Sequence, residues 1–285
     1  MNTVNREMNN DRAGMFSVFL SSICFSIGGL CVKMIPWSPL AINGARNLIG
    51  AGVIGVFILL THHEVKVNKP VIIGALSTIG VTTLFAVSNK LTTAANAIIL
   101  QYTAPVFVIL FMAVIFHVRP AKRDVVTCIA VFAGICIFFV DGLKTGNVAG
   151  DIAAVLSGVC YAGVFMMNTA RGADPVSSCF LGQLTSGIIF TPLCLNETVF
   201  TLPVLSTVFI LGVVQVGLAY LFLTYGISRI DPVAGVLITS MEPILNPVWV
   251  ALFYGETISP LSAAGAVIVF GAVVMYNISR ARETS

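Results

Sequence analysis

One stretch constrains the fold more than any other, because it is long enough to cross a bilayer and yet carries a glutamate near its centre. It covers residues 235–256, GVLITSMEPILNPVWVALFYGE, and places Glu242 beside Pro243. A transmembrane helix takes roughly 20 apolar residues, and a carboxylate at that depth is costly unless it faces protein or a water-filled cavity. The stretch therefore predicts a membrane helix that lines a protein interior.

Considered as one continuous helix, this stretch carries its small and polar residues on a single stripe. The stripe comprises Gly235, Thr239, Glu242, Asn246 and Trp249. The other faces hold mostly Val, Leu, Ile and Met. A helix that only anchored the chain in lipid would not need such a stripe. We therefore expect Thr239, Glu242 and Asn246 to contribute to a substrate-binding or coupling site.

The composition identifies the whole chain as a membrane protein. Its 285 residues are 57% hydrophobic and 9% charged, whereas a soluble domain averages about 25% charged residues. The net charge of +3 does not indicate nucleic-acid binding. The seven cysteines lie in apolar runs without metal-ligand spacing, so we expect no metal and no cofactor. No phosphate-binding loop or catalytic motif is present, which argues against an ATP-driven protein and against an enzyme.

Charged residues divide the sequence into ten apolar runs. Each run is predicted to be a helix, because open strands cannot span a bilayer. The runs cover residues 13–32, 40–60, 71–89, 94–116, 125–140, 152–168, 176–195, 204–228, 235–256 with a start near 232, and 259–278. The connections are too short for a soluble domain. The sequence thus predicts an all-α polytopic membrane protein with ten transmembrane helices.

The basic residues of the connections are distributed unequally. Eleven lysines and arginines would lie on the side that holds both termini, and only Lys33, Lys90 and Lys144 on the other. Cytoplasmic loops carry the excess of basic residues. We therefore expect a multi-pass protein of the plasma membrane, embedded in the lipid bilayer, with both termini in the cytoplasm.

The chain also contains an internal repeat. Aligning Pro105 of the fourth run with Pro243 of the ninth matches the residues around both prolines, and at nearly the same offset Pro39 matches Pro175. Each half then holds five helices, and an odd number inverts the second half relative to the first. Inverted repeats with a site at their interface are a common plan for secondary transporters.

The expected repeats are residues 1–145 and residues 146–285. Glu242, in the second repeat, has two interpretations. It is either a proton-coupling carboxylate or partner of a cationic substrate group, or a structural carboxyl that stays protonated or bonds to backbone freed by Pro243 and Pro247. Burial disfavours the charged form of a carboxylate, which would suit a proton carrier.

Arg46 is the second candidate, because it lies inside the second run. It is either a fork for a carboxylate or phosphate, or a gate that pairs with Glu242, or a side chain that reaches back to the interface. Polar residues on other runs would line the same cavity, although close helix packing also explains them. These further candidates are Gln101, Tyr102, Tyr161 and Gln183.

Several loose motifs occur together in a particular order. They are TAANA at residues 93–97 leading to Pro105, MEP at residues 241–243 followed by GE at residues 255–256, and Arg46 in the second helix. With the two five-helix halves, this pattern resembles the drug/metabolite transporter superfamily, in its ten-helix EamA family. The resemblance covers almost the whole chain.

The resemblance implies secondary transport of small metabolites, often export of amino acids or related compounds, through a cavity between inverted halves. Two positions depart from the family pattern, namely HVR at residues 117–119 in place of Gly-Glu and Phe25 in place of a tryptophan. We expect a secondary active transporter that works by alternating access around a midplane site, with export rather than uptake and with protons as a coupling ion. The alternative is a non-transporting membrane sensor or scaffold. The sequence does not indicate an oligomeric state.

Overall fold

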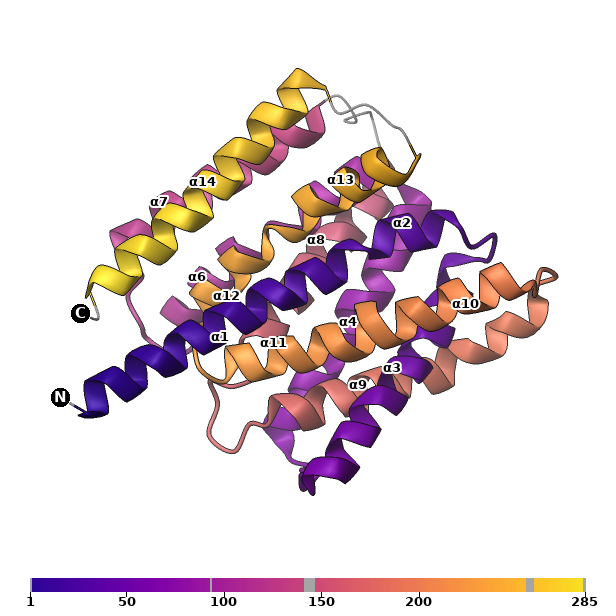
Figure 1. Cartoon of the computed structure of the whole chain (residues 1–285), viewed down its shortest axis with the longest axis horizontal. Coiled ribbons are helices and arrows are strands. Elements are labelled where there is room, and N and C mark those ends of the chain that lie inside the picture. The colour runs from indigo at the N-terminus through magenta and orange to yellow at the C-terminus, as the bar shows by residue number, and fades with distance from the viewer. Residues whose placement is uncertain (1, 93, 141–146, 255–258, 284–285) are drawn as a thin grey trace.

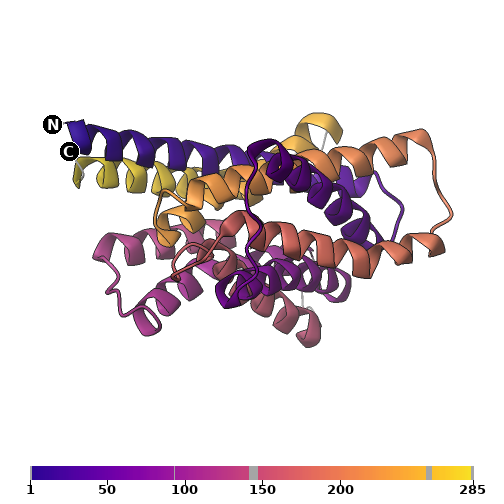
Figure 2. The same ribbon diagram turned by 90° about the horizontal axis from the view of Figure 1, so that it is seen from below.

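All the regular secondary structure in the described part of the chain is helical. A computed structural model of the protein describes residues 2–92, 94–140, 147–254 and 259–283. Long helices pack side by side, and both chain ends lie at the same end of the molecule (Figures 1 and 2). Within these residues, seven helices are long and apolar enough to cross a membrane, and shorter apolar helices cover 232–245 and 263–276. The predicted all-α membrane fold is thus confirmed.

Among its described residues, the first half holds seven helical segments. They are α1 (Asn2–Ser26), α2 (Gly28–Lys33), α3 (Pro39–Thr61), α4 (Lys69–Leu91), α5 (Ala94–Gln101), α6 (Ala104–Val114) and α7 (Lys122–Phe139). The α1 helix begins at Asn2, so the polar residues before the first predicted run, 13–32, belong to the first helix. The expected boundary between the repeats, at residues 145 and 146, touches the segment 141–146, which lies outside the described residues.

The second half repeats this order with one irregular span. Its elements are α8 (Val148–Phe165), α9 (Pro175–Phe190), the 3₁₀ segment η2 (Thr191–Asn196), α10 (Leu202–Ile210), the π-helical segment η3 (Leu211–Leu218), α11 (Ala219–Ile227), α12 (Pro232–Thr239), α13 (Glu242–Tyr254) and α14 (Pro260–Glu283). Proline stands in the first turn of α3, α4, α6, α9, α10 and α12. Its fixed φ angle and missing N–H suit that position.

The contacts between the two halves are reciprocal. Helix α4 packs along α8, and the corresponding span of the second half, η3 with α11, packs along α1. Two pairs join equivalent helices directly, α3 with α9 and α7 with α14, and the latter pair forms one edge of the molecule (Figure 1). This exchange of partners is what two inverted five-helix repeats require.

Two of the predicted spans are broken helices. The fourth run, 94–116, is interrupted between α5 and α6, and the ninth run is interrupted between α12 and α13. When Pro105 is aligned with Pro243, the two breaks coincide, because Gln101 and Ala104 then match Thr239 and Glu242. The continuous helix assumed for the stripe along 235–256 is therefore wrong, because α12 ends at Thr239 and α13 begins at Glu242.

The connections of the two halves are tied to each other at both ends of the molecule. At one end the Trp37 indole donates to the Val199 carbonyl at 2.8 Å, and the Ser38 backbone N–H donates to a Glu197 carboxylate oxygen at 2.8 Å. At the other end His63 Nε2 lies 2.7 Å from Asp174 Oδ2. At the first end, the connection before α3 is joined to the connection after α9. At the other end, the connection after α3 is joined to the connection before α9.

The link at Asp174 predicts a dependence of stability on pH. Burial raises the pKa of the Asp174 carboxyl, but hydrogen bonds from Ser177 and His63 outweigh burial and hold this pKa below the ordinary value, which is about 3.9. A carboxyl group whose pKa is lower in the folded than in the unfolded protein stabilises the fold. This stabilisation is fully present when the pH is above the pKa of the unfolded protein, and it is lost as the pH falls through the lowered pKa of the folded protein.

We therefore expect Asp174→Asn to lower the free energy of unfolding by about 1 kcal/mol near pH 7. The difference from the unsubstituted protein should shrink as the pH approaches roughly 3, which thermal melting of the purified protein would measure. Glu64→Gln, an exposed carboxylate in the facing connection, is the matched control. A difference for Asp174→Asn that does not change with pH would contradict the role of the carboxylate charge.

Candidate functional site

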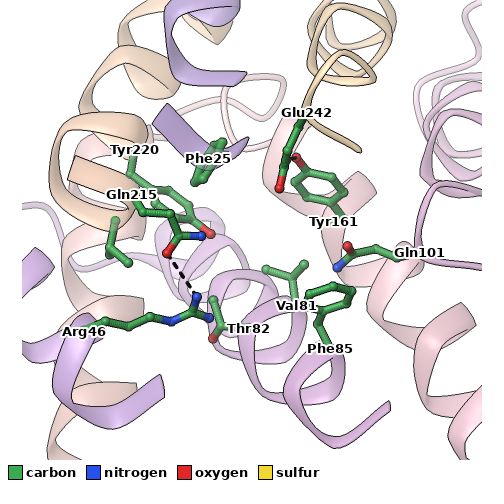
Figure 3. A pocket seen from close by; sticks show the side chains of 11 residues that line it. Phe25, Arg46, Val81, Thr82, Phe85, Gln101, Tyr161, Gln215, Tyr220 and Glu242 are labelled. Carbon is green, nitrogen blue, oxygen red and sulfur yellow. Dashed lines mark hydrogen bonds between the residues drawn. The ribbon is translucent and has the colours of Figure 1, made fainter. Parts of the chain in front are cut away.

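A cavity lies between the two halves of the molecule. It encloses about 520 Å³ of space that no atom fills, including a part that is open to the surroundings. Its lining comes from α1, α3, α4, α5, α8, η3, α11 and α13, and consists of Phe25, Arg46, Val81, Thr82, Phe85, Gln101, Tyr161, Gln215, Val216, Tyr220 and Glu242 (Figure 3).

Glu242 forms one wall of the cavity, as the first residue of α13. The hydroxyls of Tyr102 and Tyr161 both lie on its Oε2 atom, at 2.9 Å and 3.3 Å. Tyr102 comes from the break between α5 and α6, and Tyr161 comes from α8, so three spans meet at one carboxyl group. The rings of the two tyrosines pack edge to face at 6.1 Å. These contacts fix the position of the carboxyl group.

The break before Glu242 also has a hydrogen-bonding consequence. Pro243 has no N–H, so it cannot satisfy the carbonyl of Thr239 four residues earlier. The Tyr102 hydroxyl lies 3.4 Å from that carbonyl oxygen. The Thr239 hydroxyl bonds within its own helix, to Val236 at 2.9 Å. The Tyr102 hydroxyl thus lies near the carbonyl that Pro243 frees, but its single proton is shared with the closer Glu242 Oε2 atom.

Arg46 forms the opposite wall, on α3 (Figure 3). Its Nη1 atom donates to Gln215 Oε1 at 3.0 Å, and its Nη2 atom donates to Asn43 Oδ1 at 2.9 Å. The buried Nε atom has no partner among the described residues. Because the side chain points into the cavity, it does not reach back to the interface. Both of its partners are neutral, so its positive charge remains available to a bound anion.

The two charged walls do not form an ion pair with each other. Arg46 and Glu242 are both described, and their side chains face the same cavity without contact (Figure 3). The hypothesis of a gate that pairs these residues is therefore not met in this conformation. A cation and a carboxyl group on opposite sides of one cavity can together bind a molecule that carries both charges.

The other predicted site residues fall in different places. Gln101 lines the cavity and donates to Ser157 Oγ at 2.7 Å. Gln183 is fully buried and does not line the cavity, and neither atom of its amide has a hydrogen-bond partner among the described residues. Asn246 belongs to α13, but its side chain lies outside the described residues.

Seven lining residues were not among the predicted site residues, namely Phe25, Val81, Thr82, Phe85, Gln215, Val216 and Tyr220. Phe25 and Tyr220 pack edge to face at 5.1 Å between α1 and α11. Gln215 and Tyr220 could be found in the sequence as polar residues of an apolar run, but a role in helix packing explained them equally well. Tyr225, in the same run, does lie outside the site, with the Arg229 guanidinium 3.4 Å from its ring centroid.

Comparison with known proteins finds relatives that are all named as transporters or exporters. The chain is 25% identical to the transporter YwfM of Bacillus subtilis (strain 168), over 96% of this chain and 98% of the relative. It is 26% identical to the inner membrane transporter YedA of Escherichia coli (strain K12), over 84% and 82% of the two chains. It is also 26% identical to the threonine/homoserine exporter RhtA of the same strain, over 70% and 68%.

The fold and the family agree with these relatives. A solved structure superposes on this chain with a TM-score of 0.81, and the match covers 94% of this chain and 98% of the other. The two sequences are 18% identical, so this match shows a similar fold alone. Residues 12–140 and residues 148–278 each match the EamA-like transporter family. The chain therefore belongs to the EamA-like transporter family, and it is a multi-pass membrane transporter of small molecules and not an enzyme.

Proposed function

We propose that this transporter moves small zwitterionic metabolites, with amino acids as the substrate class. The observation that carries the proposal is the cavity with Arg46 on one wall and Glu242 on the other, without an ion pair between them. A guanidinium fork matches a carboxylate, and a carboxylate pairs with an ammonium group. The aromatic rings of Phe25, Tyr161 and Tyr220 supply apolar walls for a side chain between the two charges.

The mechanism is secondary active transport by alternating access. The support is the arrangement of two inverted halves around a cavity at their interface, with broken helices beside it, which is a plan that secondary transporters share. We propose Glu242 as the residue that couples flux to protons, because a carboxyl group between two tyrosine hydroxyls can hold or release a proton inside the cavity.

The proposed direction is export from the cytoplasm, with both termini in the cytoplasm and the protein in the plasma membrane. The threonine/homoserine exporter among the relatives supports export of amino acids. The excess of basic residues on the side of the termini supports the orientation, and the two termini do lie at one end of the molecule (Figure 2).

The experiment is transport of labelled amino acids in proteoliposomes under an imposed pH gradient, with L-threonine, L-homoserine and a panel of other amino acids. We expect concentrative flux of at least one amino acid, collapsing when a protonophore removes the gradient. Empty liposomes and liposomes with a denatured sample are the controls. Binding of amino acids without any flux would contradict transport, and flux of amines or organic acids alone would contradict a zwitterionic substrate.

A further inference from the structure

Gln215 reaches the cavity because its segment is π-helical. Gln215 and Tyr220 both line the cavity although they are five residues apart. In an α-helix, with 3.6 residues per turn, such residues point in clearly different directions. The hydrogen bonds of a π-helix join residues five apart, and η3 has this form over Leu211–Leu218. The irregular segment thus places an amide on the face that already carries Tyr220.

Close packing holds this segment against α3, which carries Arg46. A side-chain carbon added at Gly212 would meet Ile49 at 2.5 Å, and one added at Gly217 would meet Val53 at 2.6 Å. On the other side of Gln215, a carbon added at Gly28 would meet the Gln215 amide nitrogen at 2.9 Å. The amide therefore lies between α2 and α3, with its nitrogen toward Gly28 and its oxygen on Arg46.

The chemistry of this contact decides how much charge Arg46 can offer. A guanidinium has five N–H donors, and two of those of Arg46 go to the neutral oxygens of Gln215 and Asn43. Three donors remain, which is enough for a bidentate contact with a carboxylate. A glutamate at position 215 would have nearly the same shape, but it would form an ion pair with Arg46 and neutralise the cavity wall.

We propose that Gln215 is the residue that sets the charge selectivity of this transporter. It orients the guanidinium of Arg46 through a neutral oxygen, so that the arginine keeps its net charge for the carboxylate of the substrate. The inference rests on the proposed transport of amino acids and names a positioning residue for it. In this role Gln215 acts through Arg46 and selects substrates that carry an anionic group.

The test compares L-threonine with L-threoninamide, which keeps the ammonium group and lacks the carboxylate. In proteoliposomes we expect Gln215→Glu to lower the preference for threonine over the amide by roughly tenfold to a hundredfold, the equivalent of one charge-assisted hydrogen bond. Gln101→Glu is the matched control, because it adds the same charge to the same cavity on a side chain bonded to Ser157. It should change the preference by less than a third as much.

A second variant, Gly28→Ala, displaces the Gln215 amide without adding charge. It tests the same role even if the Gln215→Glu protein does not fold. We expect it to raise KM for threonine with little change in kcat, and to leave KM for the amide unchanged. An equal loss of preference in Gln215→Glu and Gln101→Glu, or an equal rise of both KM values in Gly28→Ala, would overturn the role of Gln215. Absence of threonine flux in the unsubstituted protein would instead overturn the proposed substrate class, so the two failures are distinct.

Discussion

Arg46→Gln is expected to lower the affinity for L-threonine by at least roughly a hundredfold, because the fork that binds the carboxylate is lost. Two charge-assisted hydrogen bonds are worth about 1.5–3 kcal/mol each, and every 1.4 kcal/mol is about a factor of ten. The affinity for L-threoninamide should hardly change. Isothermal titration or a thermal-shift series with the purified protein would measure both values.

The same substitution should not destabilise the protein. Arg46 holds a half-buried charge against the neutral side chains of Gln215 and Asn43, and a desolvated charge without an opposite charge costs free energy. We therefore expect the melting temperature of Arg46→Gln without ligand to equal or exceed that of the unsubstituted protein. Arg46→Lys keeps the charge without the fork and should recover only part of the affinity. Unchanged threonine affinity in Arg46→Gln would exclude Arg46 as a substrate contact.

Glu242→Gln is expected to abolish accumulation of substrate against its gradient while exchange of labelled for unlabelled substrate continues. A glutamine cannot release a proton, but its side-chain oxygen can still accept hydrogen bonds from the hydroxyl groups of Tyr102 and Tyr161. The geometry of the site is therefore kept. For one proton per substrate, a gradient of one pH unit, about 1.36 kcal/mol, supports roughly tenfold accumulation. In the variant this ratio should fall to about one.

The control for this experiment is Glu64→Gln, an exposed carboxylate in the connection between α3 and α4. It should accumulate substrate as the unsubstituted protein does. Counterflow in the absence of a pH gradient separates loss of coupling from loss of binding. Proton-driven accumulation that persists in Glu242→Gln would disprove the coupling role of this carboxyl group.

Much of the fold could be predicted from the sequence, because it depends on the lengths of apolar runs and on a repeat. Pro105 and Pro243 placed the equivalent positions of the two halves correctly, and both helix breaks lie next to them. The breaks themselves were not predicted. Proline removes one hydrogen bond, but whether a helix bends or stops depends on the groups around the freed carbonyl, and here the nearest is the hydroxyl of a tyrosine from the other half.

The site could be predicted in part. Glu242 and Arg46 stand out in apolar runs because charge is costly there, and Gln101 and Tyr161 were found as polar members of helical faces. Gln215 was not selected, because helix packing explains a polar residue of an apolar run equally well. Periodicity assumes 3.6 residues per turn and therefore does not predict that Gln215 and Tyr220 face the same cavity, which the π-helical form of η3 allows. Contacts between distant spans, such as that of Tyr102 with Glu242, leave no mark in a single run.

The π-helical segment also affects how relatives of this transporter can be compared. A π-helical turn holds more residues than an α-helical turn, so a relative with an α-helix throughout this span would need one residue fewer between the same two ends. Aligning the two sequences without a gap inside the helix would then assign the wrong residue to the place opposite Arg46. A comparison of substrate preference across this family therefore requires superposed structures for this span. A single inserted residue there can change which side chain faces the substrate.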